Sequence, residues 1–217
     1  MRTKQRNAAD RKRIEAALPE VVCVRGWSGT TVEDVCARAE VSRAAFDRSF
    51  SDIEDCYCAY FEAQAAILLT RSAAVFEKEE SWRDQLRGVA FTLLDFLEED
   101  PVRARVMMVE TLAAGERARL VRDQGMQALT LFIDAGRREL DDPESLSSAT
   151  AAAICGAIFN QILFEIERDN YENLRLLVPK LMYSAVLPYL GPDAAAEELQ
   201  RPVPPRSTHV ATGVDIS

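Results

Sequence analysis

The sequence has few of the residues on which metal binding and nucleophilic catalysis commonly depend. Its single histidine is His209, close to the C-terminal end, and its five cysteines contain no Cys-x-x-Cys pair. A Ser–His–Asp set, the spacing of metal ligands and a glycine-rich phosphate loop are also missing. We therefore expect no catalytic residues, no metal and no cofactor, and hence a protein that is not an enzyme. The cysteines are expected to be free thiols in a reducing compartment.

Long apolar runs are missing as well. No stretch of the chain is long and apolar enough to span a bilayer. The basic first residues, 1–6, are followed by charged residues instead of the apolar segment of a signal peptide. We expect a cytoplasmic protein that has no membrane partner.

No segment shows the sustained period-two alternation of a β-strand, whereas helical periodicity is present almost throughout, so the expected fold class is all-α. Ser42, Asp52, Ser81 and Asp100 each precede such a segment, where their side chains can cap a helix. Thr30 and Glu33 have the spacing of a capping box. Helices are expected at about 7–24, with a bend at Pro19, then at 32–39, 43–50, 53–79, 81–99, 101–114, 117–140, 146–168 and 171–190, the last with a kink at Pro179.

Two of these helices, 32–39 and 43–50, are short and are joined by a three-residue turn, which is the spacing of a helix-turn-helix. In this motif the second helix enters the major groove of DNA. Phe46 and Phe50 can anchor that helix in the core while Arg43 and Arg48 remain outside. The net charge of −9 does not exclude DNA, because the first 55 residues carry equal numbers of basic and acidic residues and begin with a basic arm.

The residues around this turn resemble the DNA-binding signature of the TetR family. The match comprises Thr30-Thr31-Val32-Glu33-Asp34-Val35, then Ala39-Glu40-Val41-Ser42-Arg43-Ala44-Ala45-Phe46, then Phe50-Ser51-Asp52-Ile53-Glu54. The resemblance implies an N-terminal three-helix helix-turn-helix domain, at 1–52, and a C-terminal helical bundle for ligand sensing and dimerisation, at 53–191. Residues 192–217 are expected to be a largely disordered tail, with one short helical turn at 194–199.

The same resemblance implies a ligand-responsive transcription regulator. We expect a repressor that is released from its double-stranded DNA operator when a small, mainly hydrophobic effector binds. The residues expected to contact DNA are Thr31, Arg43, Ala44, Ala45 and Arg48.

Three residues depart from the family pattern. Glu40 stands where the family usually has Gly, and a left-handed backbone there would cost about 1 kcal/mol. Asp47 and Ile53 replace a tyrosine and a lysine that grip phosphates in the family. Asp47 can instead accept from a cytosine amino group or pair with Arg43 or Arg48. An alternative therefore stays open: a helix-turn-helix protein with weakened or lost DNA binding that acts through protein partners.

A homodimer is expected through the last two long helices. Ala149, Ala153 and Ala157 recur every four residues, which lets helix backbones approach closely. A facing stripe on the final helix consists of Leu174, Leu177, Leu181 and Ala185. The alternative is that both faces pack only inside one chain.

The effector is expected to bind among adaptable apolar side chains and a few polar groups in the helical bundle. The residues expected to line its site are Phe91, Met107, Glu110, Thr111, Met126, Asn160, Gln161 and Phe164. The alternative for the apolar ones is an ordinary core. Asn160 and Gln161 can also bond across the dimer or face water, because a buried amide needs a partner.

Overall fold

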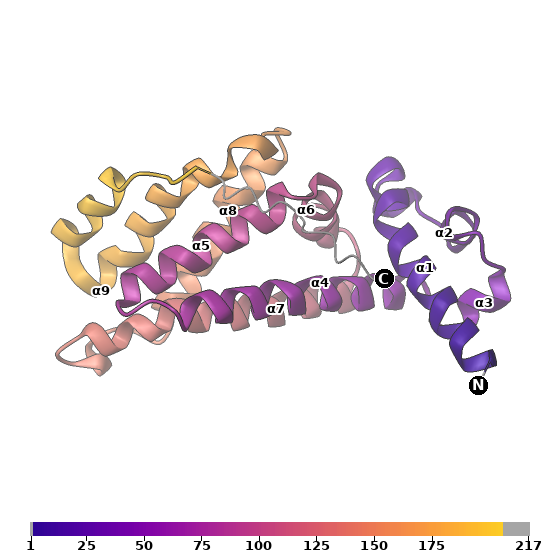
Figure 1. The fold of residues 1–217 in the computed structure, drawn as a ribbon, viewed down its shortest axis with the longest axis horizontal. Helices are drawn as coiled ribbons and strands as arrows, with labels where there is room; N and C mark the ends of the chain where they lie inside the picture. Colours follow the sequence, from indigo (N-terminus) through magenta and orange to yellow (C-terminus); the bar gives the residue numbers. More distant parts are fainter. Residues whose placement is uncertain (1, 206–217) are drawn as a thin grey trace, which may run out of the picture.

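The computed structural model describes residues 2–205, with side chains from residue 5 onward. His209 and the rest of 206–217 lie outside the described residues, as do the side chains of Arg2 and Lys4 in the expected basic arm. The described part is helical and contains no strand (Figure 1). Its α-helices are α1 Arg2–Arg25, α2 Val32–Ala39, α3 Arg43–Asp47, α4 Ile53–Phe76, α5 Trp82–Glu98, α6 Pro101–Met108, α7 Glu116–Asp134, α8 Thr150–Ile166 and α9 Val178–Gln200.

Helices α1, α2 and α3 form a small unit at one end of an elongated molecule (Figure 1). α1 runs through Pro19 and contributes Ile14, Leu18 and Val22 to a shared core. Phe46 and Phe50 enter this core from α3 and the turn after it, with their ring centroids 5.6 Å apart. The apolar anchors of the second short helix are therefore where the sequence places them.

The predicted caps at Ser42, Asp52, Ser81 and Asp100 are confirmed, because each side chain accepts a hydrogen bond from the backbone N–H three residues later. The predicted capping box is displaced by one residue. It is Thr31 that accepts from the N–H of Asp34, while the Asp34 carboxylate accepts from the N–H of Thr31. The side chain of Thr30 instead donates to the carbonyl of Gly26.

The remaining helices form a larger body. α4 runs from the small unit along the larger body beside α7, and α5 packs against α4 from another side (Figure 1). The Glu54 carboxylate, in the first turn of α4, accepts from the backbone N–H of Arg117 at 2.9 Å. It thereby occupies the N-terminus of α7, where a negative charge is favourable. The start of α4, directly after the small unit, is thus fixed to the start of α7.

The C-terminal part differs from the prediction. Residues Tyr171–Leu177 form a 3₁₀ segment, and α9 begins after it, with Pro179 in its first turn, where proline is tolerated. The kink lies at Gly191, whose φ of 80° interrupts the helix. The chain then stays helical to Gln200, so residues 192–200 of the expected tail are helical. This part contains Glu198, which is buried although the sequence does not indicate it.

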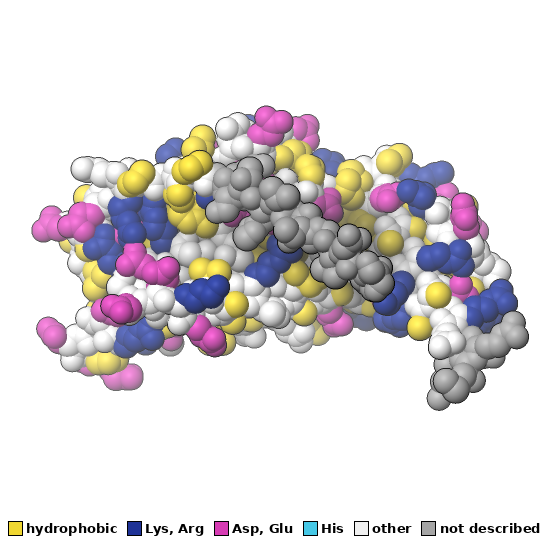
Figure 2. Space-filling model, viewed as in Figure 1, with side chains coloured by type: hydrophobic (Ala, Val, Ile, Leu, Met, Phe, Trp, Pro, Cys, Tyr) yellow, Lys and Arg dark blue, Asp and Glu magenta, His cyan; other side chains and the backbone are white. Residues whose placement is uncertain are grey.

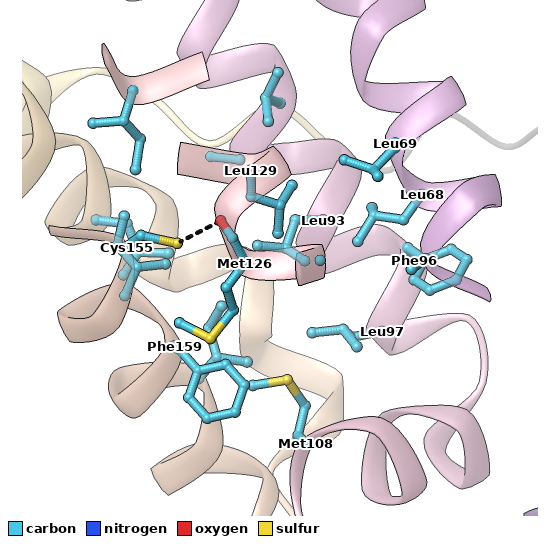
Figure 3. A pocket seen from close by; sticks show the side chains of 18 of the residues that line it. Leu68, Leu69, Leu93, Phe96, Leu97, Met108, Met126, Leu129, Cys155 and Phe159 are labelled. Carbon is cyan, nitrogen blue, oxygen red and sulfur yellow. Dashed lines mark hydrogen bonds between the residues drawn. The ribbon is translucent and has the colours of Figure 1, made fainter. Parts of the chain in front are cut away.

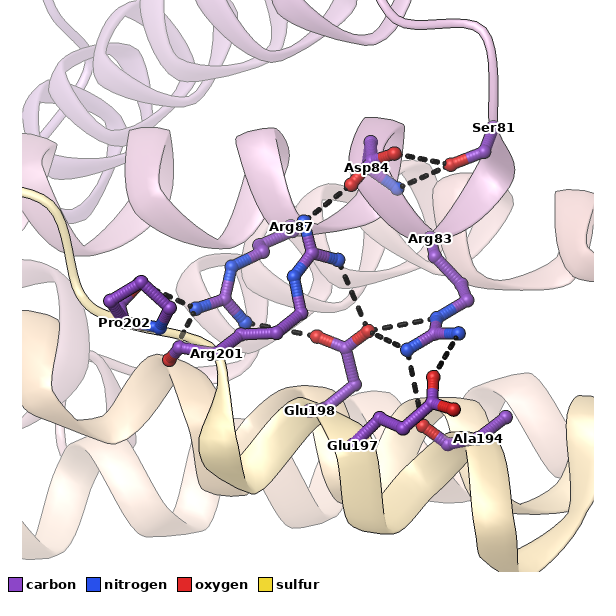
Figure 4. A network of polar contacts seen from close by, with 9 residues as sticks. All are labelled: Ser81, Arg83, Asp84, Arg87, Ala194, Glu197, Glu198, Arg201 and Pro202. Atoms are coloured by element: carbon purple, nitrogen blue, oxygen red, sulfur yellow. Dashed lines mark hydrogen bonds and ion pairs between the residues drawn. The ribbon is translucent and has the colours of Figure 1, made fainter.

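The Glu198 carboxylate is fully buried between α9 and α5 (Figure 4). It accepts from Arg83 at 2.8 Å and from Arg87 at 2.9 Å, and Arg201 adds a contact of 3.2 Å. Arg87 also donates to the carbonyls of Arg201 and Pro202. Figure 2 shows acidic and basic side chains side by side over this end of the body. These contacts hold the last section of α9 on α5.

Candidate functional site

The exposed face of α3 is the first part of the candidate site. The Ser42 side chain caps α3 by accepting from the N–H of Ala45 at 3.2 Å. Arg43, Ala44 and Arg48 are exposed on the outer side of this segment. Ala45 is only 4 % exposed and packs into the core. The structure therefore brings three of the expected DNA-contacting residues to one surface and turns Ala45 away from it.

Arg43 is held by acidic neighbours. Its Nε donates to Asp47 at 2.8 Å and its Nη1 donates to Glu33 at 2.6 Å. The hydrogen bonds from Arg43 to Asp47 and Glu33 raise the pKa of Arg43 above its ordinary value. Asp47 thus takes one of the two roles that the sequence left open, that of an ion-pair partner on its own helix. In contrast, Arg48 forms no ion pair with any side chain that the structure describes.

Two further positions of the motif have structural roles. The Thr31 hydroxyl, besides capping α2, donates to the Asp34 carboxylate at 2.7 Å and is exposed at the start of the helix. Glu40 adopts the predicted left-handed conformation, with φ of 54° and ψ of 45°. The turn of the helix-turn-helix keeps its geometry without glycine.

A cavity of about 120 Å³ in the body is the second part of the candidate site. Leucine, methionine and phenylalanine side chains from several helices point toward one another around it (Figure 3). Its polar features are few: the Met126 carbonyl already accepts from the Cys155 thiol, and one charged residue, Arg122, belongs to the wall. A cavity lined in this way stays dry and binds apolar molecules, as a cavity of about 150 Å³ lined by Leu, Ile and Phe does with benzene.

The expected effector residues are distributed over four places. Met107 and Met126 are part of the cavity wall. Phe91 lies under two guanidinium groups, Arg87 and Arg175, at 5.4 and 4.7 Å from its ring centroid. Phe164, which lies under the guanidinium of Arg168, and Asn160 are exposed, and Gln161 is half-buried; none of these three belongs to the wall.

Glu110 and Thr111 also lie outside the cavity, in a 3₁₀ turn directly after α6. The Glu110 carboxylate accepts from the backbone N–H of Trp27 at 2.9 Å. The Thr111 hydroxyl donates to the Met107 carbonyl at 2.7 Å and forms a short contact with the Tyr57 hydroxyl. Their polar groups are therefore used to join the small unit, α4 and α6.

The sequence did not single out most of the cavity wall. Leu93, Leu97, Leu129 and Phe159 have the same periodicity as ordinary core residues, so nothing local distinguishes them. Cys155, which the sequence predicts only as a free thiol, also lies in the wall. Arg122 is one of several arginines on α7, and its position at the cavity depends on how α7 meets α8.

Neither a family model nor a curated protein sequence matches the chain. Solved structures do match. FadR from Bacillus subtilis, in complex with stearoyl-CoA, has a TM-score of 0.72 at 17 % identity, covering 81 % of this chain and 97 % of that chain. The fatty acid degradation regulator FadR from Bacillus halodurans has a TM-score of 0.73 at 15 % identity, covering 82 % of this chain and 94 % of that chain. A TetR-family regulatory protein from Rhodococcus RHA1 has a TM-score of 0.63 at 19 % identity, covering 84 % of this chain and 97 % of that chain.

These similarities define the class of fold: the chain has the all-α fold of TetR-family transcription regulators, with an N-terminal helix-turn-helix, as predicted. The Bacillus subtilis protein is a transcriptional regulator, the Bacillus halodurans protein is a regulator of fatty acid degradation, and the Rhodococcus protein is a regulatory protein of the TetR family. Among residues 2–205 no cluster of potential ligands could hold a metal ion. Within the same residues no helix is long and apolar enough to cross a membrane.

Proposed function

We propose that the chain is a ligand-responsive DNA-binding transcription regulator, a repressor that leaves its operator when a small, mainly hydrophobic molecule binds. One observation carries this proposal. The chain contains both a helix-turn-helix and an apolar cavity, and both are in contact with helix α6 or the turn after it. The stearoyl-CoA bound to Bacillus subtilis FadR supports an effector with an apolar portion.

Operator binding would use the outer face of α3. Arg43, Ala44 and Arg48 are exposed there, and Thr31 is exposed at the start of α2. An arginine suits guanine, and a small residue lets the helix backbone approach the bases. Ala45 supports this surface from below instead of touching DNA.

The coupling between the two parts would pass through α6. Met107 and Met108, at its C-terminal end, line the cavity. Two and three residues later, Glu110 and Thr111 hold Trp27 and Tyr57. A ligand that displaces the methionines therefore changes the position of the turn that holds the helix-turn-helix. Only a difference in ligand affinity between the two arrangements can shift DNA binding.

The working unit would be a homodimer built on α8. Ala153, Ala157 and Phe164 are exposed on this helix, and a Cβ added at Gly156 would meet nothing within 4 Å. The leucine stripe expected to face it belongs to the chain's own core instead, since Leu174, Leu181 and Ala185 are buried. A dimer would place two α3 helices about 34 Å apart, one turn of DNA.

A second function is favoured by one observation, the pairing of Arg43 with Asp47 and Glu33. It is the helix-turn-helix protein with weakened or lost DNA binding that acts through protein partners. Because two carboxylates compensate its charge, Arg43 would contribute little to phosphate or base contacts.

A footprint on the DNA that flanks the protein's own gene, at stated salt and with stearoyl-CoA as the first probe, separates the two functions. The repressor proposal expects protection of a near-palindromic site that disappears on addition of the probe or of another apolar ligand. Arg48→Ala serves as the binding-deficient control, with circular dichroism to show that it folds. The absence of sequence-selective protection by folded protein would reject the repressor and leave the partner-binding alternative.

A further inference from the structure

Arg122 occupies a special place in the cavity wall. The other residues of the wall are hydrophobic, apart from Gly125, which has no side chain, and Cys155, which has a small one. Its side chain is 20 % exposed and that of the next residue, Asp123, is 59 % exposed, so α7 meets solvent at this point of the wall. The guanidinium lies 5.8 Å from the ring centroid of Phe159, which is also part of the wall. A charge is thus placed at the rim, where it keeps contact with water.

Within the described residues, the ion pair with Asp123 uses only part of the hydrogen-bonding capacity of Arg122. Nε and Nη2 both donate to the same oxygen of Asp123, at 3.0 and 2.6 Å. No group in the described residues accepts from Nη1. Guanidinium has five N–H donors in a planar fork that matches two oxygens of a carboxylate or phosphate. Asp123 meets the guanidinium with one oxygen only, so the two-oxygen geometry is not formed.

We propose that the cavity takes a molecule with an apolar body and one anionic end, and that Arg122 binds the anionic end at the rim. This inference rests on the proposed function and names the chemical class of its effector. The apolar body enters between α4, α5 and α8, where no charge could be solvated. The anion stays at Arg122 and displaces the exposed carboxylate of Asp123. Arg122 thereby fixes both the orientation of the ligand and its charge.

A carboxylate at the end of an aliphatic chain and a phosphate monoester on the same chain offer the same chemistry to Arg122. The test therefore compares decanoate, decyl phosphate and decanol by titration calorimetry on the full chain. The wild type is expected to bind both anions about tenfold more tightly than decanol, the size of effect that one well-placed charge-assisted contact gives. Whichever anion binds more tightly identifies the source.

Three variants make the test specific. Arg122→Gln is expected to reduce the affinity for both anions to that for decanol and to leave decanol binding unchanged. Arg119→Gln, an exposed arginine on the same helix that is not part of the wall, is the matched control and should behave as the wild type. Asp123→Asn is expected to raise anion affinity about threefold, because it removes the competing carboxylate.

The outcomes separate this inference from the proposed function. Equal binding of all three ligands, or an anion preference that survives in Arg122→Gln, would overturn the role of Arg122 and keep the apolar cavity as an effector site. Binding of none of the three by folded protein would count against the effector site itself, and so against the function on which the inference rests.

Discussion

The carboxylate of Glu110 accepts a hydrogen bond from the backbone N–H of Trp27 at 2.9 Å, although 83 residues separate the two in sequence. Trp27 follows α1, and its ring packs edge-on against Tyr57 of α4, with centroids 5.1 Å apart. Arg105, on α6, pairs with the other carboxylate oxygen at 3.6 Å. One buried acid thus joins the helix-turn-helix unit to the segment that ends at the cavity.

Replacing Glu110 by alanine is expected to weaken both the fold and the effector response. A buried N–H that loses a charged partner costs about 1–3 kcal/mol of unfolding free energy. Glu110→Gln, which keeps an acceptor oxygen, should lose less. Urea unfolding gives the stability, and gel shifts with and without effector give the response. Glu116→Gln, an exposed acid at the start of α7, is the control. A fully stable and fully responsive Glu110→Ala variant would show that this contact is incidental.

The ion pairs of Arg43 predict that Asp47 limits DNA affinity. Asp47→Asn removes an anion from the face of α3 and releases Arg43 toward phosphate. Operator affinity should rise by about three- to tenfold at low salt, and the salt dependence should steepen by about one counterion. Glu144→Gln removes an exposed charge from the body and should change neither quantity. Lower affinity in Asp47→Asn would instead mean that Asp47 accepts from a base.

Glu198 is expected to be the most sensitive acidic residue for stability. Its substitution by alanine leaves Arg83 and Arg87 without their buried partner, and breaking a buried pair costs about 3–5 kcal/mol. The control is Glu197→Ala. Glu197 lies in the same turn of α9, is 66 % exposed and also pairs with Arg83. That change should cost less than about 1 kcal/mol. Equal denaturation midpoints for the two variants would contradict the central position of Glu198.

Acid should loosen the same junction. Hydrogen bonds from Ser81 and Arg201 hold the pKa of Asp84 below its ordinary value of 3.8. Because the folded-state pKa is the lower one, ionised Asp84 stabilises the fold above 3.8, and this contribution disappears as the pH falls from there through the folded-state value. Urea midpoints measured through this range should decline less steeply in Asp84→Asn. If Asp84→Asn declines as steeply as the wild type, the acid sensitivity comes from other carboxylates.

Cys155 offers a direct probe of cavity occupancy. Its thiol is buried in the wall, and burial raises its pKa, so alkylation should be slow compared with that of the half-exposed Cys23. A ligand in the cavity should slow modification of Cys155 several-fold further and leave Cys23 unchanged. Mass spectrometry of the labelled peptides measures both rates. Ligand binding without protection of Cys155 would place the ligand elsewhere.

Local signals in the sequence were sufficient for the capped helix starts and for the helix-turn-helix unit. The caps at Ser42 and Asp52 depend on residues three positions apart, and the left-handed Glu40 depends on its own turn. Both are short-range properties that a sequence displays directly. The helix-turn-helix resemblance is of the same kind, because its anchors lie within a few turns of one another.

Long-range partners could not be predicted in this way. Glu110 and Thr111 were expected at the effector because buried polar groups need partners, and the structure gives them partners at Trp27 and Tyr57. The helix that continues past residue 192 has the same explanation, since Glu198 is satisfied by arginines more than a hundred residues away. The need for a partner is visible in a sequence, but its identity depends on the packing of the chain.

Helix α7 has few fully buried residues of its own, Ala118 and Ile133, yet it supplies Arg122, Met126 and Leu129 to the cavity wall. Local unfolding of α7 would expose less apolar area than local unfolding of a helix such as α5. The free energy of local opening is therefore expected to be lower for α7. Ligand exchange is therefore expected to be fast compared with global unfolding. The amides of α7 should exchange with solvent deuterium before those of α5, and an occupied cavity should slow them first.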